Sequence, residues 1–197
     1  MITQMTWGAN KQEFFDDNQP NEKLLYQSKT DSCKYKKLYV VTEFLNMHST
    51  HRNNFNGGQL ILGYQASPRL SIGLGTKFAY TKYHFDNEWH LHRLKFFPVF
   101  IDWKINAFSH PRTVTPFLHF SQGASYITYH KEDKHTMGRP YKVSEWGLYL
   151  YGGFGAVFRI SEHFAPVIEM GFQGFHMSSN QMAVNPHGTT IQIGFVW

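Results

Sequence analysis

From residue 37 onward, this chain alternates apolar and polar residues with a period of two. Alternation of this kind predicts β-strands with one apolar face, because successive strand residues point to opposite faces. Glycine, proline and polar clusters divide the region into eight segments. We expect strands over Leu38–Met47, Gly58–Ala66, Leu70–Tyr83, Trp89–Asn106, Thr115–Tyr129, Glu145–Ile160, Ala165–Ser178 and Gly188–Trp197.

The connections between these segments alternate in length. Short connections (SPR, AFSHPRT and SEHF) fall at one end, and longer ones (HSTHRNNFNG, HFDNE, HKEDKHTMGRPYKVS and SNQMAVNPH) fall at the other. An even number of strands with short turns at one rim and long loops at the other is typical of membrane β-barrels. We therefore predict an all-β fold, an eight-stranded antiparallel up-and-down transmembrane β-barrel over residues 37–197. Residues 1–36 are polar and weakly patterned, and we expect them to form an N-terminal extension.

The composition excludes a helical membrane protein. No run approaches 18 consecutive apolar residues, and the mean hydropathy is −0.42. Aromatic residues make up 17% of the chain and charged residues only 17%, which fits a β-rich chain with an unusual exterior. Cys33 is the only cysteine, so no internal disulfide is expected. The first residues lack the basic start and apolar core of a secretory signal, and we expect that a signal peptide was removed before residue 1.

Two arrangements of the apolar face are open. A soluble barrel that binds a small ligand would point its apolar residues inward, whereas a membrane barrel would point them toward lipid. An eight-stranded barrel has room inside for side chains and little else. The apolar face carries many large rings, while the opposite face carries small residues and a few charges, so the volumes favour the membrane arrangement. Pro98 predicts a bulge or an interrupted ladder within its strand.

The membrane arrangement assigns two residue sets. Charged residues on the inner face would pair as a network that plugs the lumen, because buried charges must be paired. Aromatic residues near strand ends would form girdles at the membrane interfaces. The lumen set is Glu43, Lys77, Asp102, Lys104, Arg159 and Glu169, and the interface set is Tyr80, Trp89, Trp103, Tyr126, Trp146 and Trp197.

With an alternating terminal strand that ends in GFVW, the chain resembles the bacterial eight-stranded outer-membrane β-barrel proteins, of OmpA/OmpX type or PorG-like. The resemblance covers about Leu38 to Trp197. It implies that the last strand closes the barrel against the first and that Trp197 lies at the periplasmic interface. It also implies residence in the outer membrane of a Gram-negative bacterium, in contact with lipid and lipopolysaccharide.

The stretch GFHMSSNQMAVNPHGTT is similar to the His-x-Ser-Asn signature of the PagL-like lipid A 3-O-deacylase barrels. The resemblance implies that Ser178 is a nucleophile and His176 its base, at the outer rim on the lipid-facing side. Two departures exist: Ser179 separates Ser178 from Asn180, and the acidic residue expected after the NPxG stretch is replaced by Thr189 and Thr190.

Many histidines map to the long-loop rim. His90 and His92 share a face at strand spacing, but the sequence supplies no fixed third ligand for a metal. Together with nearby lysines and arginines, these histidines favour a rim that faces anionic lipopolysaccharide. GLGTK and GGFG lie within strands with no helix after them, so they are not phosphate loops. We expect no cofactor, no metal and no nucleic-acid partner.

The function favoured by the sequence is that of a non-enzymatic outer-membrane barrel, a structural or accessory subunit of an envelope assembly. Its loops or N-terminal arm would be the binding surfaces, and other outer-membrane or periplasmic proteins would be its partners. A lipid A deacylase and a soluble ligand-binding barrel are the alternatives.

Overall fold

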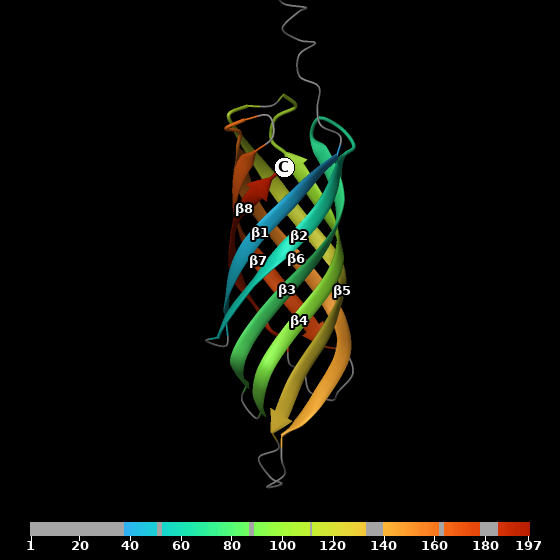
Figure 1. Ribbon diagram of the computed structural model, residues 1–197, viewed down its shortest axis with the longest axis vertical. Coiled ribbons are helices and arrows are strands. Elements are labelled where there is room, and N and C mark those ends of the chain that lie inside the picture. Colours follow the sequence, from blue (N-terminus) through green and yellow to red (C-terminus); the bar gives the residue numbers. More distant parts are fainter. Residues whose placement is uncertain are drawn as a thin grey trace, which may run out of the picture. The chain divides into compact units, whose positions relative to one another are not determined.

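The structure is a computed structural model that describes residues 38–50, 53–86, 89–110, 112–132, 140–161, 164–177 and 185–197. The predicted N-terminal extension, residues 1–36, lies outside the described residues. Within them the chain forms eight strands, close to the predicted segments (Figure 1). They are β1 (Leu38–Ser49), β2 (Asn54–Gln65), β3 (Leu70–Asp86), β4 (Trp89–Asn106), β5 (Val114–Glu132), β6 (Tyr141–Phe158), β7 (Ala165–Met177) and β8 (His187–Val196).

Each strand pairs antiparallel with its neighbours in the chain, and β8 pairs with β1 to close the barrel. The closure continues to the last residue: Trp197 N donates to Val40 O over 2.9 Å, and Val40 N donates to Trp197 O over 3.4 Å. Because every strand has two partners, the barrel has no open sheet edge. The predicted fold class is confirmed. We call the end with residues 66–69, 107–110, 112–113, 159–161 and 164 the turn-side rim, and the opposite end the loop-side rim.

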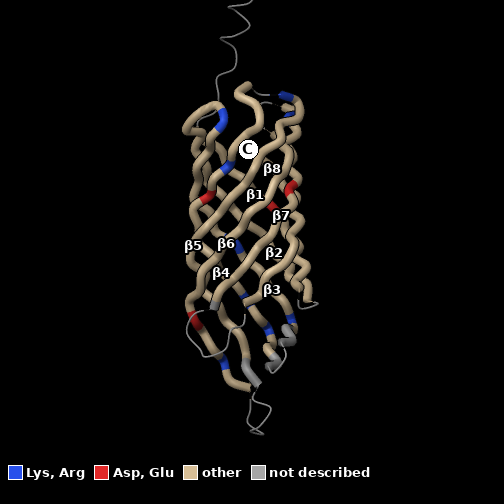
Figure 2. The backbone as a smooth tube through the Cα atoms, turned by 180° about the vertical axis from the view of Figure 1, so that it is seen from behind, with Lys and Arg blue, Asp and Glu red and all other residues tan. Residues whose placement is uncertain are grey.

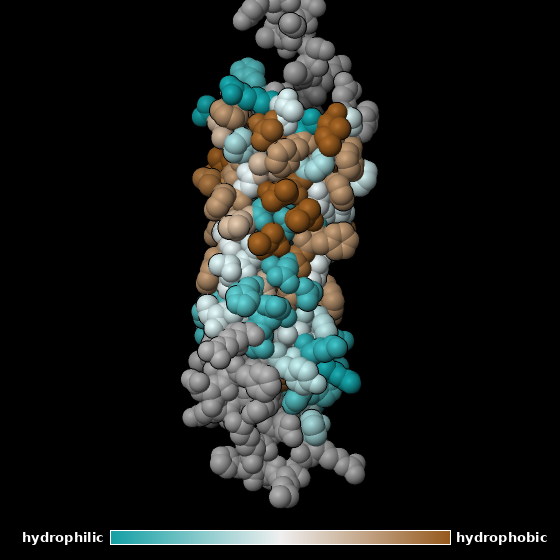
Figure 3. Space-filling view, turned by 90° about the vertical axis from the view of Figure 1, so that its left-hand side faces the viewer, coloured by the Kyte–Doolittle hydropathy of each residue, from teal (hydrophilic) through white to brown (hydrophobic). Residues whose placement is uncertain are grey.

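The apolar face points outward. Phe44 is 77% exposed, Leu74 65% and Phe154 61%, whereas Asp102 is fully buried inside the barrel. Figure 3 shows the outward apolar residues as a brown band around one side of the barrel. Charged positions are sparse along the wall, and basic ones occur at both ends (Figure 2). An exterior of this kind is stable only in lipid, so the soluble ligand-binding barrel is excluded. Among the described residues, no helix is long and apolar enough to cross a bilayer.

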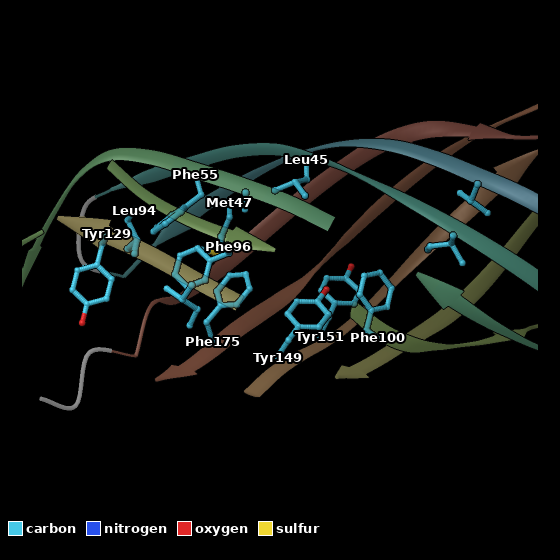
Figure 4. Close-up of a cluster of buried hydrophobic side chains, with 14 of the residues drawn as sticks. Leu45, Met47, Phe55, Leu94, Phe96, Phe100, Tyr129, Tyr149, Tyr151 and Phe175 are labelled. Atoms are coloured by element: carbon cyan, nitrogen blue, oxygen red, sulfur yellow. The ribbon is translucent and has the colours of Figure 1, made fainter. Parts of the chain in front are cut away.

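The interior differs from the prediction of small side chains with a few charges. It also contains large rings, which the outward-facing aromatic pattern did not indicate. Phe96 and Phe175 stack with centroids 4.0 Å apart, and Phe55 and Tyr149 extend the contact. Figure 4 shows this group together with Leu94 and Met47 across the loop-side half of the interior. Inner-face glycines leave volume for two neighbouring rings: a Cβ on Gly75 would meet Phe100, and a Cβ on Gly153 or Gly171 would meet Tyr151.

Strand β4 contains two irregularities. The β3–β4 pairing skips Phe97 and Pro98, as expected for a proline without a backbone donor. A register shift against β5 lies between His92 and Lys95, where Arg93 has φ 55°. This is a β-bulge, which places one extra residue in β4. As a result, Leu91 and Leu94 are both buried although they are three residues apart.

Candidate functional site: the barrel interior and the loop-side rim

A polar cluster fills the middle of the barrel. Its centre is His119 on β5, whose Nδ1 lies 2.5 Å from Glu169 Oε1 on β7. The other ring nitrogen, Nε2, contacts Asp102 Oδ1 on β4. Ser121, two residues along the same inner face, donates to Asp102 Oδ1 over 3.2 Å. All four side chains are buried, so water outside the barrel does not screen these charges.

Two lysines complete the charge balance. Lys104 on β4 lies on the turn side of the cluster, with Nζ 5.2 Å from the centroid of Phe117. Lys77 on β3 lies on its loop side, where Nζ donates to Tyr149 Oη over 2.6 Å and to Gln173 Oε1 over 2.7 Å. The faces of Tyr149 and Tyr151 lie 5.0 and 5.2 Å from the same ammonium group, within cation–π range.

The protonation of His119 follows from its contacts with the two carboxylates and with Ser121, whose Oγ lies 2.8 Å from Nε2 and donates its own proton to Asp102. A neutral imidazole has one donor and one acceptor nitrogen, whereas both nitrogens of His119 face carboxylate oxygens. Both contacts are favourable when the ring is an imidazolium. The cluster then holds three positive groups and three carboxylates, Glu43 being the third, with Gln59 donating to it. Buried charges are tolerated when they are balanced in this way.

Five of the six predicted lumen residues are buried in this cluster: Glu43, Lys77, Asp102, Lys104 and Glu169. The placement of Arg159 in the lumen was wrong. Strand β6 ends at Phe158, and Arg159 follows it at the turn-side rim with an exposed side chain. Its backbone N donates to Thr113 O over 2.8 Å. His119 was missing from the predicted set because a histidine is formally neutral at pH 7. Its inward position, as register partner of the buried Lys104, was the available signal.

The predicted interface aromatics lie outward where the structure describes them. Tyr126 and Trp146 are direct partners on β5 and β6, with ring centroids 5.4 Å apart toward the loop side. Tyr80 on β3 is half-buried, and its distance from the turn-side rim is similar to that of Tyr126 and Trp146. Trp103 and the exposed Trp197 lie near the turn-side rim. The side chain of Trp89 lies outside the described residues.

The loop-side rim holds the histidine features found in the sequence. His176 on β7 is exposed, and its Nδ1 lies 2.9 Å from Asn185 Oδ1. Ser178, its predicted partner, lies outside the described residues. His92 and His130 are direct partners of β4 and β5. In the described part of the chain, no three His, Cys, Asp or Glu side chains are placed to hold a metal ion together.

Basic residues gather on the outer face of β3–β6 at the same rim. Exposed Lys82, Arg93, Lys95 and Lys142 lie just beyond the loop-side aromatic residues. Lys95 is the register partner of Tyr80 on one side and of Thr128 on the other. Cations next to interfacial rings are suited to contact anionic groups at a membrane surface.

Comparison with family models and with curated proteins finds no match. Solved structures do match. The N-terminal β-barrel domain of Pseudomonas aeruginosa OprF has a TM-score of 0.50 at 12% identity, covering 81% of this chain and 97% of that one. Neisserial surface protein A has a TM-score of 0.54 at 10% identity, covering 81% and 96%. A major outer membrane protein of Thermus thermophilus has a TM-score of 0.55 at 12% identity, covering 83% and 99%.

At this level of identity, the similarity shows a shared fold alone. It agrees with the closed eight-stranded barrel, the apolar exterior and the polar interior described above. Residues 38–197 of this chain therefore have the fold of the eight-stranded transmembrane β-barrels of outer-membrane proteins.

Proposed function

We propose that the protein is a non-enzymatic barrel of the outer membrane of a Gram-negative bacterium, an accessory subunit of an envelope assembly that acts through its rims. The filled interior carries this proposal. The polar cluster around His119 and the aromatic group around Phe96 and Phe175 occupy successive levels of the lumen, which supports a role other than transport. In a barrel whose interior is filled and whose wall faces lipid, the surfaces that remain for recognition are at the two ends.

The partner chemistry that the loop-side rim favours is the phosphate of lipopolysaccharide. Lys82, Lys95 and Lys142 are exposed cations beside the aromatic residues that mark the edge of the apolar band. Cations near a membrane surface attract anionic headgroups. Protein partners would bind to the same rim or to the loops above it.

Lipopolysaccharide retained by the purified barrel tests this proposal. The wild type is compared with Lys82→Gln/Lys95→Gln/Lys142→Gln after purification in mild detergent, and phosphate per barrel is measured together with co-purifying proteins. We expect the triple variant to retain several-fold less lipopolysaccharide. The matched control is Arg69→Gln/Arg159→Gln, which removes exposed cations from the turn-side rim and should retain the wild-type amount. Equal retention in all three samples would contradict the proposal.

A second function is favoured by one contact, between His176 Nδ1 and Asn185 Oδ1 at 2.9 Å. An amide oxygen that holds one imidazole nitrogen orients the ring, so that the other nitrogen can act as a base toward a nearby hydroxyl. Asn185 would supply the orienting group that the missing acidic residue supplies in the deacylase resemblance. Ser178, two residues after His176, would be the nucleophile in hydrolysis of a lipid A ester.

Lipid A mass spectra test the hypothesis that the barrel is a deacylase. Cells producing the wild type would lose one acyl chain from lipid A, and cells producing Ser178→Ala would not. Asn185→Ala should lower the extent of deacylation while the barrel remains folded, as judged by heat-dependent gel mobility. Identical spectra from wild-type and empty-vector cells would exclude this activity without affecting the proposed role of the basic rim.

A further inference from the structure

The outward apolar band is much shorter on one side of the barrel than on the other. Counted from the turn-side rim, β1 presents four outward residues before its first amide side chain, Asn46, and β8 presents four before Thr189. On β6 the corresponding number is seven, and on β5 the outward residues extend over seven positions to Tyr126 with one amide among them, Gln122 at the fifth position. The outward residues are Leu38, Val40, Thr42 and Phe44 on β1; Trp197, Phe195, Ile193 and Ile191 on β8; Val114, Pro116, Leu118, Phe120, Gln122, Ala124 and Tyr126 on β5; and Phe158, Ala156, Phe154, Gly152, Leu150, Leu148 and Trp146 on β6.

This difference is large on the scale of a bilayer. Two residues of a strand tilted by about 40° advance about 5 Å along the barrel axis. Four outward residues therefore span about 15 Å and seven span about 30 Å, while an outer-membrane barrel presents an apolar band about 25 Å tall. The band on β6 is sufficient to cross the hydrocarbon layer, and so is the band on β5 apart from Gln122 within it. The band on β8 and β1 ends about 10 Å short of the layer.

The fifth outward position shows the contrast at one height. Since the turn-side ends of the strands form one rim, positions with the same count lie at about the same level. On β3, β4 and β6 this position holds Phe78, Phe97 and Leu150, which are 40–42% exposed. On β8, β1 and β2 it holds exposed Thr189, Asn46 and Asn56. At this level β3, β4 and β6 are apolar, β5 carries the exposed amide of Gln122, and β8, β1 and β2 are all polar.

The short side carries a group of exposed polar side chains, which we call the polar notch, and two pairs of them are hydrogen-bonded. Asn46 Nδ2 donates to Asn56 Oδ1 over 2.7 Å, and one level higher His48 Nδ1 lies 2.7 Å from Asn54 Oδ1. Thr189 on β8 is the register partner of His48. The members of the polar notch are Asn46, His48, Asn54, Asn56, His176 and Thr189.

Figure 3 views the barrel from the side on which β8 lies in Figure 1. The brown band covers the upper part of this side, and hydrophilic residues begin about halfway down. No outward position described on β7, β8, β1 or β2 is an Asp or a Glu. The notch therefore presents amides, hydroxyls and imidazoles, which donate hydrogen bonds to phosphate and sugar oxygens without opposing their negative charge.

Hydrocarbon at this level would leave the polar side chains of the notch without water, although the exposed apolar residues at this level on β3, β4 and β6 require hydrocarbon there. We propose that the polar notch binds the headgroups of the surrounding lipid, which descend about 10 Å deeper on the β8–β1–β2 side than on the β5–β6 side. The bilayer is thinner beside the notch than on the opposite side of the same barrel. This proposal rests on the membrane-spanning fold and is independent of the proposed partners at the loop-side rim.

Site-directed spin labelling tests the proposal in vesicles of phosphatidylcholine with lipid A. Cys33 is first replaced by serine, and single cysteines are introduced at the fifth outward position: Asn46→Cys and Thr189→Cys in the notch, and Phe97→Cys and Leu150→Cys as matched controls on the other half. Collision rates with oxygen, which concentrates in hydrocarbon, and with a water-soluble nickel chelate report the depth of each label. Ile193→Cys, two outward positions closer to the turn-side rim than Thr189, serves as the lipid-facing control on the short side.

We expect the labels at residues 46 and 189 to collide several-fold more with the nickel chelate than the labels at residues 97 and 150. The label at residue 193 should be lipid-like. Equal depth for all four fifth-position labels would overturn the proposal. A second outcome would also overturn it: labels at 46 and 189 that neither reagent reaches and that become reachable when the protein is diluted in lipid, because a second copy would then cover the notch.

A variant that extends the apolar band provides an independent measurement. In Asn46→Leu/Asn56→Leu, the short side gains one apolar level, and a label at Phe44→Cys should move deeper into hydrocarbon than the same label in the parent. Heat-dependent gel mobility establishes that each variant is folded. An unchanged depth at residue 44 would contradict the proposal even if the single labels behave as expected.

Discussion

Lys77 and Tyr149 meet inside the barrel from strands β3 and β6, where Lys77 Nζ donates to Tyr149 Oη over 2.6 Å. Gln173 Oε1 and the face of the Tyr149 ring also contact this ammonium group, so it is held by hydrogen bonds and an aromatic face. Its charge nevertheless balances the cluster: three carboxylates face Lys77, Lys104 and the imidazolium of His119. The stability of the barrel therefore depends on charge balance as well as on packing.

Replacing Lys77 by methionine should destabilise the barrel strongly. The change keeps the apolar stem but leaves one uncompensated negative charge in the cluster around His119, and breaking a buried charge balance costs about 3–5 kcal/mol. Urea unfolding of barrels folded into lipid vesicles measures the loss. Lys82→Met, at an exposed outward position five residues later, is the control and should change the free energy of unfolding by less than about 0.5 kcal/mol. Similar effects of the two changes would contradict the charge-balance account.

His119 and Glu169 should show strong non-additivity. His119→Leu removes a buried positive charge and leaves the carboxylates of Glu169 and Asp102 without the imidazolium between them. Adding Glu169→Leu restores neutrality, since Glu43 and Asp102 then face Lys77 and Lys104. We expect the double variant to be more stable than His119→Leu alone by about 2 kcal/mol or more, a coupling measured by a double-mutant cycle. Additive losses would show that His119 is not the charge that balances Glu169.

The purified barrel should not conduct ions. The stacked rings of Phe96 and Phe175 lie on the loop side of the polar cluster, so an ion would have to pass both. In planar bilayers, we expect the current after insertion of the wild type to equal that of the lipid alone, with no steps. Stepwise single-channel currents from a preparation free of other porins would contradict a filled lumen.

Closure of β8 against β1 requires glycine at position 194. A Cβ built on Gly194 would lie 2.0 Å from Thr42 O and 2.5 Å from Glu43 Cγ, and the backbone atom cannot yield. Gly194→Val should therefore prevent closure, which heat-dependent gel mobility reports as loss of the fast-migrating folded form. Gly152→Val is the matched control on β6, because a Cβ there meets no atom within 4 Å. A folded Gly194→Val barrel would show that β8 can shift its register.

Period-two alternation was sufficient to predict the strands, because lipid on one side and a narrow lumen on the other reverse the environment at each residue. The bounds of β4 match the prediction, Trp89–Asn106. The large interior rings could not be predicted in the same way. Phe96 and Phe175 are inward because of their parity, but their stacking joins β4 to β7 across the lumen, and that pairing depends on the register around the barrel.

The polar cluster was predicted in part. Parity placed Glu43, Lys77, Asp102, Lys104 and Glu169 inside, and the structure brings them near one another. Arg159 was misplaced because the sequence does not show where a strand leaves the barrel wall, and β6 ends one residue earlier. The contact of His119 with two carboxylates depends on the relative height of β4, β5 and β7, which follows from the register around the whole barrel rather than from any single segment.

The extra residue at Arg93 has a practical consequence for anyone grafting foreign peptides onto this scaffold. Toward the turn side, even-numbered residues of β4 face the interior, but beyond the bulge the buried residue is Leu91. An epitope spliced into β4 before residue 93 must therefore be designed with the opposite odd–even phase from one spliced in after it. If the even-numbered rule were applied to residues before 93, the side chains designed for the interior would lie on the outer face of the barrel, and those designed for lipid would lie inside.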